Sequence, residues 1–518
     1  MALRVCRVVV GALAFTWLAA CAGQIGAEHE ETEVELQSSA LKLRVECKDN
    51  FDAVYKRPGG NQGGSLGDIV RCNKGGKVGT SEITPALVSR GFDLTAQKAV
   101  KLFRISYRTQ RLAGQADLAT ALVALPAKKD VAASVAVEED DEEEDKGGDG
   151  KRLPLVVFAH GTWPYGTSCA PSKLDPLQCS TTGDNDTELV TIMALASQGY
   201  PVIAPDYAGY VEGSRSPGYL LSEDEAHSVL DATRAMNKLR QKAVDKVVLL
   251  GHSQGGHAVL SAQALAKKYG HAGKLVGVVA AAPFWAPART LGMLAGAPPP
   301  LGNDPSVLAF VVEYFYTHAE VLDGAGQGKQ LFQPNKREAL RKYVNQCSFT
   351  DSYCTFINPV PPSLGLAPDF FQPDFLEAVS SCGFEKDACS TPGLAKKWGN
   401  RFVADRPKLD PTGAPVLMWH GALDAVVPMT FGTCAYQKIS SDLSANKFTF
   451  CGDVGADHDQ ILSFDLAWVM GWINARANGS PEPAACSNYL TFAAEVAATY
   501  GGLVDITCPA YPSPVNID

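Results

Sequence analysis

Residues 251–255, which read Gly-His-Ser-Gln-Gly, hold a serine in a pattern that can do nucleophilic chemistry. The apolar residues 247–250 precede them, and a helical pattern over 257–266 follows. This order is typical of a sharp strand-to-helix turn that lifts a serine hydroxyl clear of a sheet, with glycines where a side chain would clash. The sequence therefore predicts Ser253 as a nucleophile that attacks a carbonyl carbon.

A serine nucleophile needs a base that takes its proton and an acid that orients the base. Asp424 lies in the loop beyond the strand-like residues 415–419, where a carboxylate can meet an imidazole above a sheet. His458 lies in a loop just before the helical run 461–475. The chain order Ser253, Asp424, His458 therefore predicts a catalytic triad.

Other residues compete for these roles. Asp424 could instead cap the N-terminus of a helix. Asp453, Asp457 and Asp459 are too close to His458 in the chain to reach the far side of its ring easily. Three histidines sit beside glycines of motifs and are expected to support loops; they are His160, His252 and His420.

The negative oxygen that forms during the attack needs two backbone N–H donors. The first expected donor is Gln254, directly after the nucleophile at the start of a helix. The second is expected in the loop after the apolar run 155–159, where His160-Gly161 leads to Thr162. We therefore expect the N–H groups of Thr162 and Gln254 to form the oxyanion hole.

Alternating strand and helix patterns supply the scaffold for these residues. Continuous apolar runs are typical of parallel strands buried on both faces, so the alternation predicts an α/β fold with a mostly parallel central sheet flanked by helices. Two alternating runs, 102–109 and 119–125, predict an antiparallel hairpin at a sheet edge with Gly114 in its turn. The predicted parallel strands are 155–159, 201–204, 246–250, 275–280 and 415–419, and the predicted helices are 187–198, 223–242 and 254–269.

The alternation stops between residues 286 and 408, where proline-rich turns interrupt helical runs. The run 305–322 is apolar nearly all round, which indicates a helix buried inside a cap domain. A second interpretation, compatible with the first, is a lid whose inner face holds an acyl chain. The sequence therefore predicts a helical cap or lid inserted into the core.

The chain contains the motifs Tyr55-Lys56-Arg57-Pro58, His160-Gly161-Thr162, Pro205-Asp206-Tyr207 and residues 251–256. Together these motifs resemble the secretory lipase family of the α/β-hydrolase superfamily. The resemblance implies the α/β-hydrolase fold with a lid, and hydrolysis of lipid or aryl carboxylic esters without a cofactor. The chain departs from the family pattern in its acidic run, its lipid-anchor signal, its cysteine-bearing tail and Val211, where glycine is usual.

The N-terminus predicts export. Arg4 and Arg7 precede an apolar stretch over 8–20 that is too short to span a bilayer. It ends in Leu18-Ala19-Ala20-Cys21, which resembles the bacterial lipobox and implies a membrane anchor through lipidated Cys21. An ordinary cleaved signal with an incidental cysteine is the alternative. The formal net charge of −10 argues against a nucleic-acid partner.

The cysteines agree with an oxidising compartment. The chain has 14 cysteines, and an even number remains after Cys6 in the signal and Cys21 at the anchor are set aside. The chain has no CxxC motif and no histidines clustered near cysteines, so neither a metal nor another cofactor is predicted. Sequence neighbours are the simplest disulfide partners, namely Cys47–Cys72, Cys169–Cys179, Cys347–Cys354, Cys382–Cys389, Cys434–Cys451 and Cys486–Cys508.

These predictions divide the chain into segments. The eight consecutive acids at 138–145 favour a solvated loop over a calcium site, because like charges repel. The predicted segments are a lipoprotein-type signal (1–21), an acidic tether (22–50), a first core part (51–285, with the acidic loop 138–150), the cap or lid (286–408), a second core part (409–480) and a disulfide-stapled tail (481–518).

The leading functional hypothesis is an exported serine hydrolase that cleaves carboxylic esters through an acyl-enzyme intermediate, with an ester or lipid as substrate. A serine peptidase or an acyltransferase on the same fold is the first alternative, because a triad serves all three reactions. The second alternative is a catalytically inert surface lipoprotein that binds apolar ligands, and the complete set of Ser253, Asp424 and His458 argues against it.

Overall fold

A computed structural model describes residues 43–59, 63–127, 152–166, 169–177, 186–285, 289–297, 304–347, 359–484, 486 and 492–494. All of them belong to the unit Ser39–Asp518. The predicted signal with Cys21, the acidic run 138–145 and most of the C-terminal tail lie outside the described residues. Among the described helices, none is long and apolar enough to cross a membrane.

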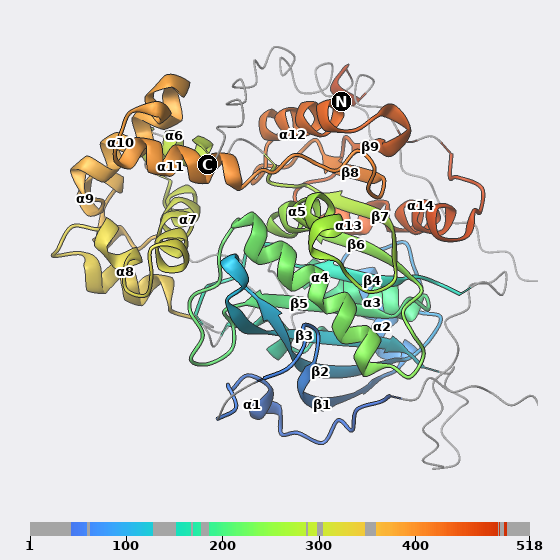
Figure 1. The fold of residues 1–518 in the computed structure, drawn as a ribbon. Coiled ribbons are helices and arrows are strands. Elements are labelled where there is room, and N and C mark those ends of the chain that lie inside the picture. Colours follow the sequence, from blue (N-terminus) through green and yellow to red (C-terminus); the bar gives the residue numbers. More distant parts are fainter. Residues whose placement is uncertain are drawn as a thin grey trace, which may run out of the picture. The chain divides into compact units, whose positions relative to one another are not determined.

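A nine-stranded sheet with the order β1-β2-β3-β5-β4-β6-β7-β8-β9 forms the centre of this unit (Figure 1). Neighbouring strands pair in parallel from β5 through β4 to β9, and β1, β2, β3 and β5 pair antiparallel. The strands are β1 (Ile69–Val78), β2 (Val100–Gln110), β3 (Ala116–Pro126), β4 (Leu155–Ala159), β5 (Val202–Ala208), β6 (Lys246–His252), β7 (Lys274–Ala281), β8 (Val416–Gly421) and β9 (Phe448–Asp453).

The structure confirms the five predicted parallel strands and the β2–β3 hairpin, but the prediction that the hairpin lies at the sheet edge is wrong. The edge is β1, which pairs with β2 from Ile69 to Val78. The sequence does not predict β1, because its glycines and lysines break the apolar alternation that marks a strand. At the other edge, β9 is also an addition to the predicted sheet.

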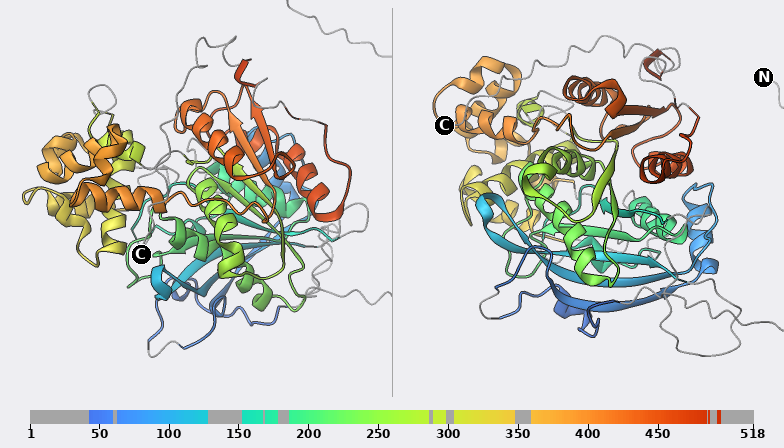
Figure 2. Two further views of the ribbon diagram at one scale, coloured as in Figure 1. Left: turned by 45° about the horizontal axis from the view of Figure 1, so that its top comes forward. Right: turned by 45° about the vertical axis from the view of Figure 1, so that its right-hand side comes forward.

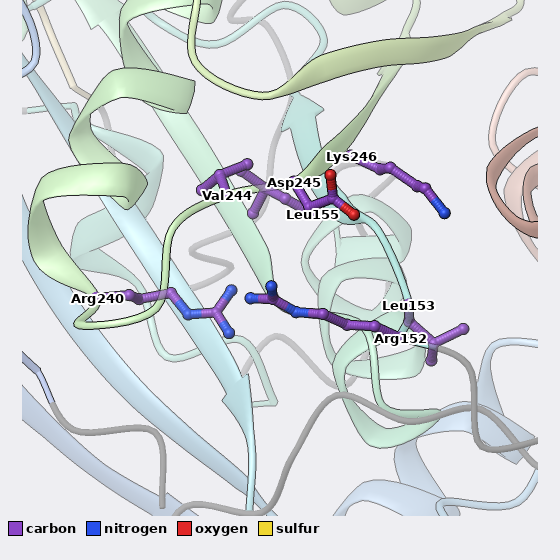
Figure 3. Close-up of a pocket in the computed structure, with 7 residues that line it drawn as sticks. All are labelled: Arg152, Leu153, Leu155, Arg240, Val244, Asp245 and Lys246. Carbon is purple, nitrogen blue, oxygen red and sulfur yellow. The ribbon is translucent and has the colours of Figure 1, made fainter. Parts of the chain in front are cut away.

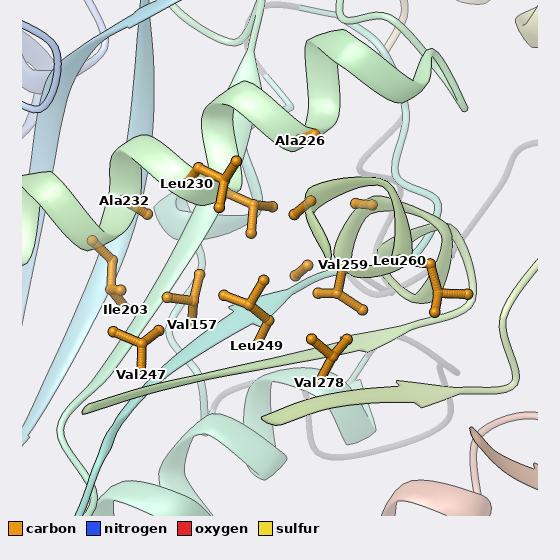
Figure 4. Packing of buried hydrophobic residues seen from close by; sticks show 14 of the residues in the cluster. Val157, Ile203, Ala226, Leu230, Ala232, Val247, Leu249, Val259, Leu260 and Val278 are labelled. Atoms are coloured by element: carbon orange, nitrogen blue, oxygen red, sulfur yellow. The ribbon is translucent and has the colours of Figure 1, made fainter. Parts of the chain in front are cut away.

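Helices cover both faces of the sheet. On one face, α4 (Ser222–Leu239), α5 (Gln254–Tyr269) and α12 (Met429–Asp442) share a hydrophobic core with the strands. Figure 4 shows Leu230 of α4 and Val259 of α5 above Val157, Leu249 and Val278. The opposite face is covered by α2 (Thr80–Ser89), α3 (Asp186–Ser197), α13 (Ile461–Phe464) and α14 (Leu466–Asn478).

The predicted helix at 461–475 is interrupted in the structure. Asp465, with φ −118° and ψ 19°, separates α13 from α14. The hydrophobic pattern continues through this break, because Ile461, Leu466 and Ile473 all lie in the same core. A periodicity argument therefore predicts the buried face correctly and misses the interruption.

A separate helical block follows β7. The apolar helix α7 lies at its centre, and its aromatic residues pack with those of the neighbouring helices, as in the contacts of Phe315 with Phe375 and Trp398. This block has its own hydrophobic core, as expected for an all-round apolar helix. Its helices are α6 (Arg289–Ala295), α7 (Pro305–Leu322), α8 (Arg337–Val344), α9 (Ala367–Phe370), α10 (Pro373–Phe384) and α11 (Leu394–Ala404) (Figures 1 and 2).

Three polar contacts join the helical block to the core. The hydroxyl of Thr317 accepts a hydrogen bond from the N–H of Tyr219 at 3.2 Å. After α11, the carbonyl of Asp405 accepts a hydrogen bond from His257 at 2.6 Å, and Arg406 donates one to the carbonyl of Trp285 at 3.1 Å. The division into core and mobile lid stays a prediction, and these contacts mark where such a lid would be held.

The disulfide pairings are confirmed in part. Cys47–Cys72 and Cys382–Cys389 form as predicted. The other four predicted pairs are wrong. Cys169 bonds Cys347, which excludes the predicted partners of both. Cys451 bonds Cys486, which excludes the pairs Cys434–Cys451 and Cys486–Cys508, and Cys434 is disulfide-bonded to another cysteine. Sequence proximity fails here because the fold brings remote loops together. Cys169–Cys347 spans 178 residues and ties the segment after the Thr162 loop to the end of α8.

Candidate active site

Ser253 occupies the turn between β6 and α5 in a strained backbone conformation. Its φ of 56° and ψ of −115° lie outside the regions that residues with a side chain ordinarily adopt. Two backbone bonds hold the turn: Ser253 N–H donates to the carbonyl of Ala281 at 2.9 Å, and His257 N–H donates to the carbonyl of Ser253 at 3.2 Å. Such strain persists only where the surrounding structure enforces it, and it is common at functional sites.

The glycines of the motif allow this turn to pack against its neighbours. A Cβ atom on Gly255 would lie 1.9 Å from the carbonyl oxygen of Ala159, and one on Gly251 would lie 2.0 Å from that of Gly255. Real Cβ atoms do not approach backbone atoms so closely, so the turn excludes even alanine at both positions. The sequence pattern therefore identifies a sharp turn for a steric reason that the structure makes explicit.

The structure brings Asp424 and His458 together. The Nδ1 of His458 donates to Oδ2 of Asp424 at 2.7 Å, and both side chains are buried. The other carboxylate oxygen of Asp424 accepts the N–H groups of Val426 at 2.9 Å and Val427 at 2.7 Å. Burial alone would raise the pKa of Asp424, but the charge and hydrogen bond of His458, the charge of His420 and the Val427 bond together lower it.

His252 links the loop of His458 to the turn that carries Ser253. Its Nε2 lies 2.8 Å from the carbonyl oxygen of His458, and the two ring centroids are 4.6 Å apart. Because His252 directly precedes Ser253, the imidazole of His458 lies beside the strand end that presents the serine. His252 thus supports a loop, in agreement with the sequence-based expectation.

The two predicted oxyanion donors belong to two segments, the start of α5 and the loop after β4. Gln254 is the first residue of α5, so its N–H has no acceptor within the helix. The N–H of Gly161 donates to Glu188 at 2.7 Å, and the next N–H along this loop is that of Thr162. The loop runs close to the serine, since a Cβ on Gly161 would lie 3.3 Å from the Cβ of Ser253.

A second buried network surrounds Gln254. Glu225 accepts hydrogen bonds from Gln254 Nε2 at 2.7 Å and from His257 Nδ1 at 2.7 Å. Burial alone would lower the pKa of His257, but the charge and hydrogen bond of Glu225 and the bond to Asp405 raise it. Tyr165 also donates to the side-chain oxygen of Gln254, at 3.2 Å. This network fixes the start of α5, where the oxyanion would bind.

The sequence did not identify Glu188, Glu225 or the role of His257. Glu188 and Glu225 lie in the first turns of α3 and α4, on helices whose sequences read as ordinary amphipathic segments. One weak signal was available, because a buried helix face that contains a glutamate needs a partner for its charge. The partners are remote in sequence, so only the fold reveals the contacts.

The small pocket in Figure 3 lies far from this site. It is lined by Arg152, Leu153, Leu155, Arg240, Val244, Asp245 and Lys246. Leu155 and Lys246 begin β4 and β6, whereas Ser253 follows the carboxyl end of β6. In parallel sheets of this type, ligands bind at the carboxyl ends of the strands, so this pocket is not the candidate active site.

Known lipases are similar to this chain in sequence. Residues 175–291 match the family model described as secretory lipase. Lipase 5 of Candida albicans is 24% identical over 455 residues, which are 86% of this chain and 84% of that protein. Lipase A of Moesziomyces aphidis is 28% identical over 183 residues, which are 34% of this chain and 33% of that protein.

Solved structures share the fold. The rice cell wall degrading esterase LipA from Xanthomonas oryzae matches with a TM-score of 0.56 and 20% identity, over 80% of this chain and 98% of that chain. Candida antarctica lipase A in its closed state matches with a TM-score of 0.53 and 17% identity, over 84% and 90% of the two chains. The chain therefore has the α/β-hydrolase fold, and its residues 175–291 are similar to the secretory lipase family.

Proposed function

We propose that the protein hydrolyses carboxylic esters through a triad of Ser253, His458 and Asp424. The observation that carries this proposal is the 2.7 Å hydrogen bond between Asp424 and His458, in a loop held against the Ser253 turn by His252. A carboxylate on Nδ1 fixes the tautomer whose Nε2 can accept a proton. The strained turn and the helix start at Gln254 supply the nucleophile and an oxyanion donor.

The reaction follows from these groups. Ser253 Oγ forms a bond to the acyl carbon while His458 takes its proton, and the carbonyl oxygen becomes an oxyanion bound by the N–H groups of Thr162 and Gln254. When this intermediate collapses, the ester C–O bond breaks and the alcohol leaves with the proton from His458. A water molecule, deprotonated by His458, then attacks the acyl-enzyme, and the acid leaves as Ser253 regains its proton.

The substrate class is tested with a series of p-nitrophenyl esters of increasing acyl length, with peptide p-nitroanilides in parallel. Ser253, His458, Asp424 and Gln254 are all buried, so we expect substrate to reach the serine only after part of the covering chain moves. For a lipase we expect kcat/KM to be higher for medium and long acyl chains than for acetate, with no cleavage of the anilides. Activity limited to acetate would contradict the lipase assignment, and faster cleavage of the anilides would favour a peptidase.

We further propose that the protein is exported and anchored in a membrane through Cys21. The basis is the Leu18-Ala19-Ala20-Cys21 pattern after a short apolar segment. In a bacterial host, radioactive palmitate is expected to label the wild type and Cys6→Ala but not Cys21→Ala, and only Cys21→Ala should leave the membrane pellet. Cys6 is the matched control because it lies inside the same segment. Equal labelling of all three proteins would contradict the anchor.

A further inference from the structure

A buried glutamate lies between the Thr162 loop and the Ser253 turn. Glu188, in the first turn of α3, is 1% exposed. Its Oε1 accepts the N–H of Gly161 at 2.7 Å and the Nδ1–H of His252, also at 2.7 Å. The indole N–H of Trp163 lies 3.5 Å from its other oxygen. One carboxylate oxygen therefore binds the residue before Thr162 and the residue before Ser253.

The ring of His252 extends this connection to a third loop. Its Nε2 faces the carbonyl oxygen of His458 at 2.8 Å, while its Nδ1 faces Glu188. A carbonyl and a carboxylate are both acceptors, so the ring must donate from both nitrogens and is an imidazolium. Its positive charge is balanced by Glu188 at a site where neither side chain is more than 1% exposed.

We propose that Glu188 and His252 are positioning residues for the ester hydrolysis proposed above, on which this inference rests. The pair joins three loops that must act together: the oxyanion loop through Gly161, the serine turn through His252, and the base loop through the carbonyl of His458. Neither residue is required to touch the substrate. Their effect would be to hold Thr162, Ser253 and His458 at the correct positions relative to one another. This matters because misplacement of a reacting group by about 1 Å can lower the rate on the order of 100-fold.

The titration of His252 reports on the pair. Burial alone would lower its pKa, but the hydrogen bond and charge of Glu188, with smaller contributions from Asp459 and the His458 carbonyl, raise it to about 9 from the ordinary 6.5. The charged or titratable groups that face His252 are Glu188, Asp459, His420 and His458. The stabilisation is fully present below pH 6.5 and is lost as the pH rises through about 9.

The test is Glu188→Gln, which keeps the shape of the side chain and removes its charge. The amide oxygen can take the place of Oε1 and accept both hydrogen bonds, while the NH₂ group faces the indole N–H of Trp163, so the main change is the loss of the charge that balances the imidazolium of His252. We expect kcat on a p-nitrophenyl ester to fall about 10- to 100-fold, with KM changed by less than about threefold. In the same variant, the pKa of His252, followed by ¹⁵N NMR of labelled histidine and assigned with His252→Gln, should fall towards its ordinary value.

Asp231→Asn is the matched control. Asp231 is a fully buried carboxylate on α4 that accepts hydrogen bonds from Thr109 at 2.8 Å and Tyr269 at 2.6 Å. Tyr269 ends α5, about 20 Å along the helix from its start at Gln254. This variant is expected to lower the melting temperature, as we also expect for Glu188→Gln, while kcat per folded molecule stays within about twofold of the wild type.

The outcomes separate a positioning role from a structural one. Unchanged kcat in folded Glu188→Gln, an equal loss in Asp231→Asn, or a wild-type His252 that titrates near its ordinary value would each overturn the proposal. The NMR measurement does not depend on turnover. A wild type without Ser253-dependent esterase activity would therefore refute the proposed function, while a normal pKa for His252 in an active enzyme would refute the positioning pair alone.

Discussion

Replacing Ser253 with alanine is expected to lower kcat for ester hydrolysis by about a millionfold. The variant has no nucleophile on the turn, so the acyl-enzyme cannot form and only direct attack by water remains. The residual rate would come from the oxyanion donors and from substrate binding. The measurements are kcat on a p-nitrophenyl ester and mass spectrometry of the protein after treatment with a fluorophosphonate, which should modify the wild type alone.

Ser261→Ala is the control for this experiment. Ser261 lies two turns further along α5, is fully buried, and its hydroxyl has no hydrogen-bond partner among the described residues. The substitution removes a hydroxyl from the same helix and leaves the turn unchanged, so kcat should stay within about twofold of the wild-type value. Retention of more than about 1% of wild-type activity by Ser253→Ala would be incompatible with the proposed mechanism.

The parts of the fold with strong periodicity could be predicted from the sequence. The helix at 254–269 and the helix at 305–322 agree with α5 and α7 at both ends, because each begins and ends at clear polar or glycine boundaries. The central parallel strands were equally clear, because burial on both faces gives continuous apolar runs. The edge strand β1 was not predictable, because its polar residues meet the requirements of a half-exposed strand and equally those of a loop.

The disulfides and the buried charges depend on the fold. The bond between Cys169 and Cys347 joins segments that only the packing of the helical block against the core brings together. Glu188 and Glu225 each bind a histidine from another helix or strand, and no spacing along the chain encodes those pairs. The chain order of Ser253, Asp424 and His458 was informative because it reflects the order of strands in the sheet.

Replacing Asp424 with asparagine is expected to reduce kcat by about 10⁴-fold while the loop keeps its shape. Oδ1 of Asp424 accepts two backbone N–H groups, from Val426 and Val427, so the amide oxygen of an asparagine must face them. The NH₂ group then faces Nδ1 of His458, where Oδ2 now accepts a hydrogen bond. The imidazole must turn Nδ1 into an acceptor and carry its proton on Nε2, the nitrogen needed to receive the proton of Ser253.

Asp457→Asn separates this effect from a general change of charge near the base. Asp457 adjoins His458 in the chain, but its carboxylate accepts the N–H groups of Asp459 at 3.1 Å and Gln460 at 2.8 Å, contacts that an asparagine oxygen can also make. Its kcat should therefore stay within about threefold of the wild type, measured at the same pH. If Asp457→Asn lost as much activity as Asp424→Asn, the tautomer argument would fail, since the hydrogen bond to Nδ1 of His458 comes from Asp424.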